Sequence, residues 1–218
     1  MLARPDLTTG LRLFALFALG ALVMRGAGCV VSDIADRKID ALVERTSLRP
    51  LASGELNLRQ ALALLFFLLS VGFAVLLQFN FFAIKLGIAS LALVFTYPFM
   101  KRITYWPQAF LGLTFNWGAL LGWAAVNGRL DVPAWWLYAA GFFWTLGYDT
   151  IYAHQDKADD LAEGVKSSAI ALGKNTKGFL IFTYLICASL LLLASHKPLI
   201  IIACLHLAWQ VRAFAEND

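Results

Sequence analysis

The chain is 218 residues long, the length of one large domain or two small ones. Hydrophobic residues make up 60% and charged residues 15% of it, against about half and about a quarter in a soluble globular domain. Together with a mean hydropathy of +0.70, this composition excludes a soluble enzyme, a disordered chain and a fibrous protein. The net charge is +4, but the sequence has no contiguous basic stripe, so no nucleic-acid partner is expected.

Seven apolar stretches come close to the roughly 20 residues that a helix needs to cross the hydrocarbon core of a membrane. They are rich in Leu, Ala and Phe and lack the alternation of a transmembrane barrel, so they are predicted to be helices. The stretches are 11–31, 59–78, 81–99, 107–126, 133–153, 178–195 and 198–213. We therefore expect an all-α, polytopic membrane protein, with one domain over residues 1–218 in contact with membrane lipid.

Three of the connections between these stretches are polar and cationic, near 32–58, 100–106 and 149–177. Loops rich in lysine and arginine stay on the cytoplasmic side of a membrane, so all three are expected there. A bacterial inner membrane is the expected location. The sequence gives no indication of an oligomeric state.

Ten of the fourteen acidic residues fall in the first and third of these loops. In each loop, carboxylates recur at spacings of three and four residues, which places them on one face if the helix continues. The first set is Asp33, Asp36 and Asp40, and the second is Asp149, Tyr152, Asp156 and Asp160.

Like charges stacked on one helix face repel and need compensation. Neighbouring lysines and arginines would supply it as a solvated, salt-bridged surface. The alternative is Mg²⁺, which binds a few carboxylate oxygens and keeps its other positions for water and substrate phosphates. Two such clusters are expected to hold Mg²⁺ around one diphosphate, with pyrophosphate as the leaving group. Phe, Tyr and Trp rings would then stabilise the resulting carbocation.

At these residues the sequence resembles the UbiA-type intramembrane prenyltransferases. The segments GCVVSDIADRKID at 28–40 and RPLASG at 49–54 resemble the family's first aspartate-rich motif. The segments YDTIYA at 148–153 and GVKS at 164–167, with the aspartates between them, resemble the second. Tyr97-Pro98, Lys101-Arg102 and Pro107-Gln108 match the basic loop between the two motifs. Within the family, 49–54 and 148–167 look most like the members that act on 4-hydroxybenzoate.

The resemblance implies Mg²⁺-dependent transfer of a polyprenyl group from polyprenyl diphosphate to the ring of 4-hydroxybenzoate, a step of ubiquinone biosynthesis. It implies one Mg²⁺ site at Asp33, Asp36 and Asp40 and another at Asp156 and Asp160, with Asp149 and Asp159 supporting them. The residues that it implies for substrate binding are Arg45, Arg49, Lys101, Arg102, Tyr152, Asp159 and Lys166.

Two departures from the family pattern stand out. The first motif normally opens with Asn-Asp, and Ser32 holds the Asn position here. The family normally has nine helices around a central cavity, whereas this chain is expected to lack the first and the last of them.

Three alternatives remain open at this stage. The same chemistry on another aromatic acceptor would use a naphthoate, homogentisate, haem or chlorophyllide ring. An inactive family member would still bind lipid diphosphate. A cation transporter would place carboxylates deep within the spans, whereas these lie at span ends.

A separate feature, the GxxxG spacing of Gly118 and Gly122, predicts close packing between helices.

Overall fold

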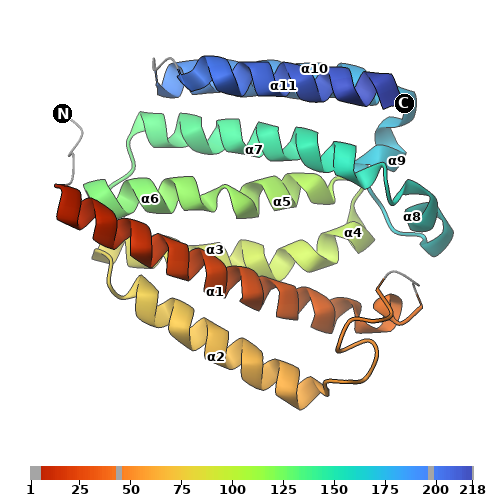
Figure 1. Ribbon diagram of the computed structural model, residues 1–218, viewed down its shortest axis with the longest axis horizontal. Helices are drawn as coiled ribbons and strands as arrows, with labels where there is room; N and C mark the ends of the chain where they lie inside the picture. The colour runs from red at the N-terminus through yellow and green to blue at the C-terminus, as the bar shows by residue number, and fades with distance from the viewer. Residues whose placement is uncertain (1–5, 43–45, 196–198, 218) are drawn as a thin grey trace. The chain divides into compact units, whose positions relative to one another are not determined.

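A computed structural model describes the chain over residues 6–42, 46–195 and 199–217 (Figure 1). Over these residues the protein is helical and contains no strand, which confirms the predicted all-α class. The elements in chain order are α1 (Leu7–Asp40), α2 (Leu58–Leu76), α3 (Phe81–Thr96), η1 (Tyr97–Phe99), α4 (Met100–Ile103), α5 (Pro107–Phe115), α6 (Trp117–Asn127), α7 (Val132–Ala153), α8 (Lys157–Glu163), α9 (Ser168–Leu172), η2 (Gly173–Asn175), α10 (Thr176–Ala194) and α11 (Leu199–Asn217).

All seven predicted stretches are helical, and five helical segments of the described chain are long and apolar enough to cross a membrane. These five are Leu7–Lys38, Leu58–Leu76, Phe81–Ile103, Pro107–Asn127 and Ser168–Ala194. A sixth apolar helix, Ile200–Phe214, is shorter. The protein is therefore a multi-pass membrane protein.

The remaining predicted span, 133–153, corresponds to α7, which is 22 residues long but is not one of the five. Its sequence contains three tryptophans, three tyrosines and Asp149, which make it less apolar than its length suggests. A count of about seven spans therefore requires two further helices to cross the membrane. These are α7, which is less apolar than the five, and α11, whose apolar part is shorter.

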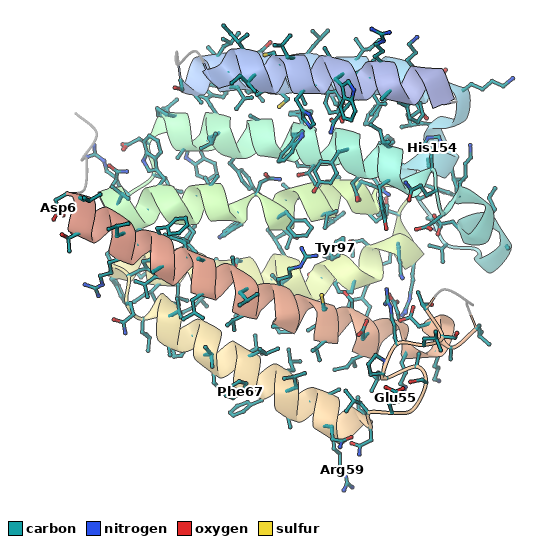
Figure 2. All side chains as sticks on the ribbon, viewed as in Figure 1. Asp6, Glu55, Arg59, Phe67, Tyr97 and His154 are labelled. Carbon is teal, nitrogen blue, oxygen red and sulfur yellow. The ribbon has the colours of Figure 1, made fainter. Side chains whose placement is uncertain are left out.

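The chain divides into two compact units. The first comprises Met1–Pro98 and Ala124–Gly128. Within it, α1 packs along α2, and Figure 1 shows the two helices side by side. A glycine at position 72 lets the helices approach, because a Cβ there would lie 2.7 Å from the sulfur of Met24. On α2, Phe67 is largely exposed, as expected for a side chain that faces lipid (Figure 2).

The second unit comprises Phe99–Trp123 and Arg129–Asp218. In it, α7 packs against both α5 and α10, as Figure 1 shows, and α10 also packs against α11. A buried cluster of Ala140, Tyr184, Cys187 and Leu207 joins α7, α10 and α11. This packing holds α7, whose C-terminal half carries Asp149 and Tyr152.

The predicted close-packing role of Gly118 and Gly122 is wrong. A Cβ at either position would meet none of the described residues within 4 Å. Other glycines of this unit make close approaches, among them Gly147 on α7, where a Cβ would lie 2.7 Å from Cζ of Tyr184. Which glycine supports packing depends on what the neighbouring helix presents, and the GxxxG spacing does not contain that information.

Candidate functional site

The first acidic segment lies on the last turns of α1. Because the helix continues to Asp40, the spacing of three and four residues places Asp33, Asp36 and Asp40 on one face, as predicted. Asp36 and Asp40 are buried, with 7% and 6% of their surface exposed, and Asp33 is half-buried. Buried carboxylates need charged or hydrogen-bonding partners, since their desolvation is costly.

Arg49 supplies that compensation. One nitrogen of its guanidinium, Nη1, donates to Oδ1 of Asp33 and to Oδ2 of Asp40, each at 3.0 Å. The loop after α1 brings it back to the helix. The Thr46 hydroxyl donates to the Asp40 carbonyl at 3.1 Å, and the Arg49 amide donates to the Thr46 carbonyl at 3.0 Å. A single cationic group therefore bridges two of the three predicted metal ligands.

Over the described residues, no three His, Cys, Asp or Glu side chains are grouped in a way that could hold a metal ion. The donor set of the first segment nevertheless suits Mg²⁺, which prefers carboxylate oxygens. Two of these oxygens already share one cationic nitrogen. The aspartates on α1 therefore offer oxygen atoms of the kind that a cation binds, and the Arg49 guanidinium lies between two of them here.

The second acidic segment is not one continuous helix face. Asp149 and Tyr152 lie on α7, which ends at Ala153, and Asp160 lies on α8, which begins at Lys157. The amides of His154 and Gln155 donate to carbonyls three residues back, which tightens the last turn of α7. Asp156 is the N-cap residue of α8, although its side chain makes no capping hydrogen bond. The predicted alignment over eleven residues therefore breaks between the two helices.

At the end of α7, His154 is held in a structural contact (Figure 2). Its Nε2 lies 3.1 Å from the hydroxyl of Thr176, and its ring packs against Phe214 with centroids 5.1 Å apart. These contacts fix the junction at which the chain leaves α7 for α8.

After α8, the chain turns back through Gly164, whose φ of +69° is a left-handed conformation that favours glycine. The turn delivers Lys166 to the basic loop. Its backbone amide donates to the carbonyl of Lys101 at 3.0 Å, and its ammonium donates to the carbonyl of Ile103 at 3.1 Å. The ammonium also lies 5.4 Å from the ring centroid of Tyr105. The second unit thus brings the predicted cations Lys101 and Lys166 together.

A buried hydrogen-bond chain ties the same loop to α7. Oε1 of Gln108 accepts from the backbone amide of Ser168 at 3.2 Å, and the hydroxyls of Ser168 and Thr150 are 2.8 Å apart. Because the Thr150 hydroxyl already donates to the carbonyl of Leu146 at 2.7 Å, Ser168 is the donor in that pair. This series of hydrogen bonds reaches Thr150, the residue that follows Asp149. Sequence reasoning assigned no role to any of its members, although Gln108 lies in the motif Pro107-Gln108.

The side chains of two predicted site residues are not described by the structure. Arg45 lies outside the described residues, as does the side chain of Asp159. Arg102 lies on α4 with Lys101.

Comparison with known proteins identifies the family. A sequence model described as the UbiA prenyltransferase family matches residues 1–217. The chain belongs to this family. The resemblance carried by the two aspartate-rich motifs is therefore confirmed.

Curated relatives share about half of their aligned residues with this chain. Proteins named "4-hydroxybenzoate polyprenyltransferase, mitochondrial" are 57% identical over 169 residues in Caenorhabditis elegans, which is 77% of this chain and 48% of the relative. The corresponding identity is 56% over 177 residues in Drosophila melanogaster, covering 81% and 44% of the two chains. It is 50% over 182 residues in Homo sapiens, covering 82% and 48%. The chain thus spans about half the length of these relatives.

Solved structures agree with the fold. The apo structure of a UbiA homolog from Aeropyrum pernix K1 matches with a TM-score of 0.70 at 30% identity, over 81% of this chain and 67% of that one. A UbiA homolog from Archaeoglobus fulgidus bound to GPP and Mg²⁺ matches with a TM-score of 0.69 at 17% identity, over 90% and 73%. The arrangement of helices is therefore that of intramembrane prenyltransferases.

Proposed function

We propose that this protein transfers a polyprenyl group from a polyprenyl diphosphate to the ring carbon ortho to the hydroxyl of 4-hydroxybenzoate, in ubiquinone biosynthesis. The observation that carries the proposal is the identity of 50% to 57% with curated relatives named for this activity. The chain spans about half the length of those relatives. That it carries out the activity for which they are named is therefore itself proposed here.

In the first unit, Asp33, Asp36 and Asp40 are proposed to hold one Mg²⁺. Arg49 would release at least one carboxylate when the metal binds, since its guanidinium bridges two of them. The released cation would then be free to contact a phosphate oxygen of the donor, or the carboxylate of the acceptor. Arg45 is proposed to act with it.

In the second unit, Asp156 and Asp160 are proposed to hold the other Mg²⁺, with Asp149 and Asp159 in support. Lys101, Arg102 and Lys166 are proposed to bind the anionic groups of the substrates, and Tyr152, half of whose surface is exposed, to contact them as well. The backbone contact between Lys166 and Lys101 supports this assignment, because it keeps two of these cations in one place.

For this prenyl transfer, the main tasks of the protein are to position the two substrates and to stabilise the charges that develop. The bond between the allylic carbon and the diphosphate oxygen breaks, and pyrophosphate leaves with the electron pair. The electron-rich phenol carbon forms the new bond to the allylic carbon, and the ring then loses its proton. Bound Mg²⁺ would supply charge neutralisation of the leaving pyrophosphate. Lysine and arginine side chains orient the diphosphate, and aromatic rings shield the allylic cation from water.

The location proposed for this reaction is a membrane with the acidic loops on the cytoplasmic side. A bacterial inner membrane stays a prediction, and the curated relatives carry the word mitochondrial in their names.

The test is a transfer assay on membranes that contain the protein, supplied with 4-hydroxybenzoate and a polyprenyl diphosphate. Prenylated product should form with Mg²⁺ and disappear with EDTA. Parallel reactions with a naphthoate and with homogentisate identify a different acceptor. Absence of product from correctly inserted protein with all acceptors would refute the proposed activity and leave the inactive, diphosphate-binding alternative.

A further inference from the structure

Gln108, at the start of α5, is buried, and only the oxygen of its side-chain amide is hydrogen-bonded within the described residues. It exposes only 5% of its surface. Its Oε1 accepts from the backbone amide of Ser168, the first residue of α9. That amide is a donor and nothing else, so the carboxamide can be oriented in only one way, with oxygen toward Ser168 and nitrogen away from it.

The amide nitrogen of Gln108 has two hydrogens to donate and no hydrogen-bond partner in the part of the chain that the structure describes. It is also not among the fully enclosed polar atoms that lack a partner. The nitrogen therefore reaches an accessible surface, while the rest of the side chain is buried. A donor held this way by its own oxygen is pre-organised for an acceptor that comes from outside the chain.

The surroundings of this donor indicate what kind of acceptor it would take. The segments that Gln108 joins carry Lys101, Arg102 and Lys166, and Lys166 is two residues from Ser168. The acidic neighbour on α7 is Asp149, next to Thr150, and no bond joins it to Gln108 in this structure. Two donor hydrogens on a side chain whose neighbouring segments carry three cations favour an anionic oxygen.

A neighbouring polar group also lacks a partner. The hydroxyl of Ser167, between Lys166 and Ser168, is buried and has no partner among the described residues. A fully buried hydroxyl is normally hydrogen-bonded. Because this hydroxyl is enclosed, it does not itself contact an incoming molecule, and the donor that can do so is the carboxamide of Gln108.

We infer that the carboxamide nitrogen of Gln108 donates a hydrogen bond to an anionic oxygen of a substrate, either a phosphate oxygen of the prenyl donor or the carboxylate of the aromatic acceptor. This inference rests on the proposed function. Gln108 is a binding residue in it, and Ser168 and Thr150 are positioning residues, since they act by holding its oxygen side.

A purely structural role for Gln108 predicts that Gln108→Glu binds substrate as the wild type does. Its oxygen caps the first amide of α9, and Glu in its place would keep that cap because a carboxylate oxygen also accepts from a backbone amide. Gln108→Glu removes only the two donor hydrogens and adds a negative charge. The chain offers a control in Gln60, whose Oε1 also accepts from a backbone amide, that of Asn57 at 2.9 Å, in the capping box of α2.

The experiment compares the wild-type protein, Gln108→Glu and Gln60→Glu, each purified as the full chain in detergent. Binding of inorganic pyrophosphate with Mg²⁺, and separately of 4-hydroxybenzoate, is measured by the shift in unfolding temperature as each probe is titrated. In Gln108→Glu the dissociation constant of one probe should rise by about 10- to 100-fold, the range expected for a hydrogen bond to a charged group. The affected probe identifies the source of the anion, and Gln60→Glu should bind both as the wild type does.

Gln108→Met guards against a variant that fails to fold because of its added charge. Methionine has a similar length and neither donates nor adds charge, so it should weaken the same probe by about 10-fold. In the transfer assay, the Michaelis constant of the same substrate should rise. If the wild type binds a probe and both Gln108 variants bind it equally well, the inference is wrong and the proposed function stands. If the wild type binds neither probe and transfers no prenyl group, the proposed function fails and the inference fails with it.

Discussion

Replacing Gly147 by alanine tests the packing that holds the second acidic segment. The added Cβ would overlap the ring of Tyr184 on α10, meeting Cε1 and lying 2.7 Å from Cζ and 3.0 Å from Cδ1. Carbon atoms pack at about 3.5 to 4.0 Å, so the ring or the helix must shift by about 1 Å. Tyr184 has little room for this, since only 4% of its surface is exposed.

The expected change in stability combines two opposing terms. Overpacking of this kind costs about 1–3 kcal/mol. Exchange of glycine for alanine within a helix returns about 1 kcal/mol. Gly122→Ala, on α6, is the matched control, because nothing lies within 4 Å of a Cβ there and only the favourable term applies. Gly147→Ala should therefore be less stable than Gly122→Ala by about 1–3 kcal/mol.

The assay is unfolding of the purified protein in mixed micelles, followed by circular dichroism at increasing SDS. A second comparison adds Tyr184→Leu to Gly147→Ala, which removes the overlapping ring and should recover much of the difference. If Gly147→Ala were as stable as Gly122→Ala, the reasoning that α7 and α10 meet at this glycine would be refuted.

Four further outcomes are expected. Asp36→Asn and Asp156→Asn, tested separately, should each abolish prenyl transfer without affecting membrane insertion, and retained turnover in both would contradict the metal assignments. Ser32→Asn, which restores the residue typical of the family, should preserve or raise activity, whereas a clear loss would show that the serine is no defect. Tyr184→Phe should leave the protein as stable or make it more stable by about 1 kcal/mol in thermal unfolding, because the hydroxyl is buried without a partner among the described residues. Arg49→Gln should destabilise EDTA-treated protein by about 1–3 kcal/mol, since Asp33 and Asp40 lose their cation, and Mg²⁺ should restore part of the loss. No stabilisation by Mg²⁺ would argue against a metal at these aspartates.

The sequence by itself determined the class of the protein and the geometry of its first acidic segment. Long apolar stretches predict membrane helices because a chain in lipid must satisfy its backbone hydrogen bonds within each segment. Inside one unbroken helix, spacing alone places side chains on a face, so the alignment of Asp33, Asp36 and Asp40 followed from sequence. The family also followed from the sequence, because its motifs are long and occur in order.

Only the tertiary structure decided the features that depend on residues far apart in the chain. The break between Asp149 and Asp160 lies where Thr176 and Phe214 hold His154 at the end of α7, and a spacing rule assumes that no such break occurs. Gly147 supports close packing and Gly122 does not, because Tyr184 on another helix faces only the first. Gln108 acquires a fixed donor because an amide sixty residues away takes its oxygen. Such contacts are set by packing between helices, where the position of each side chain depends on partners that local sequence does not specify.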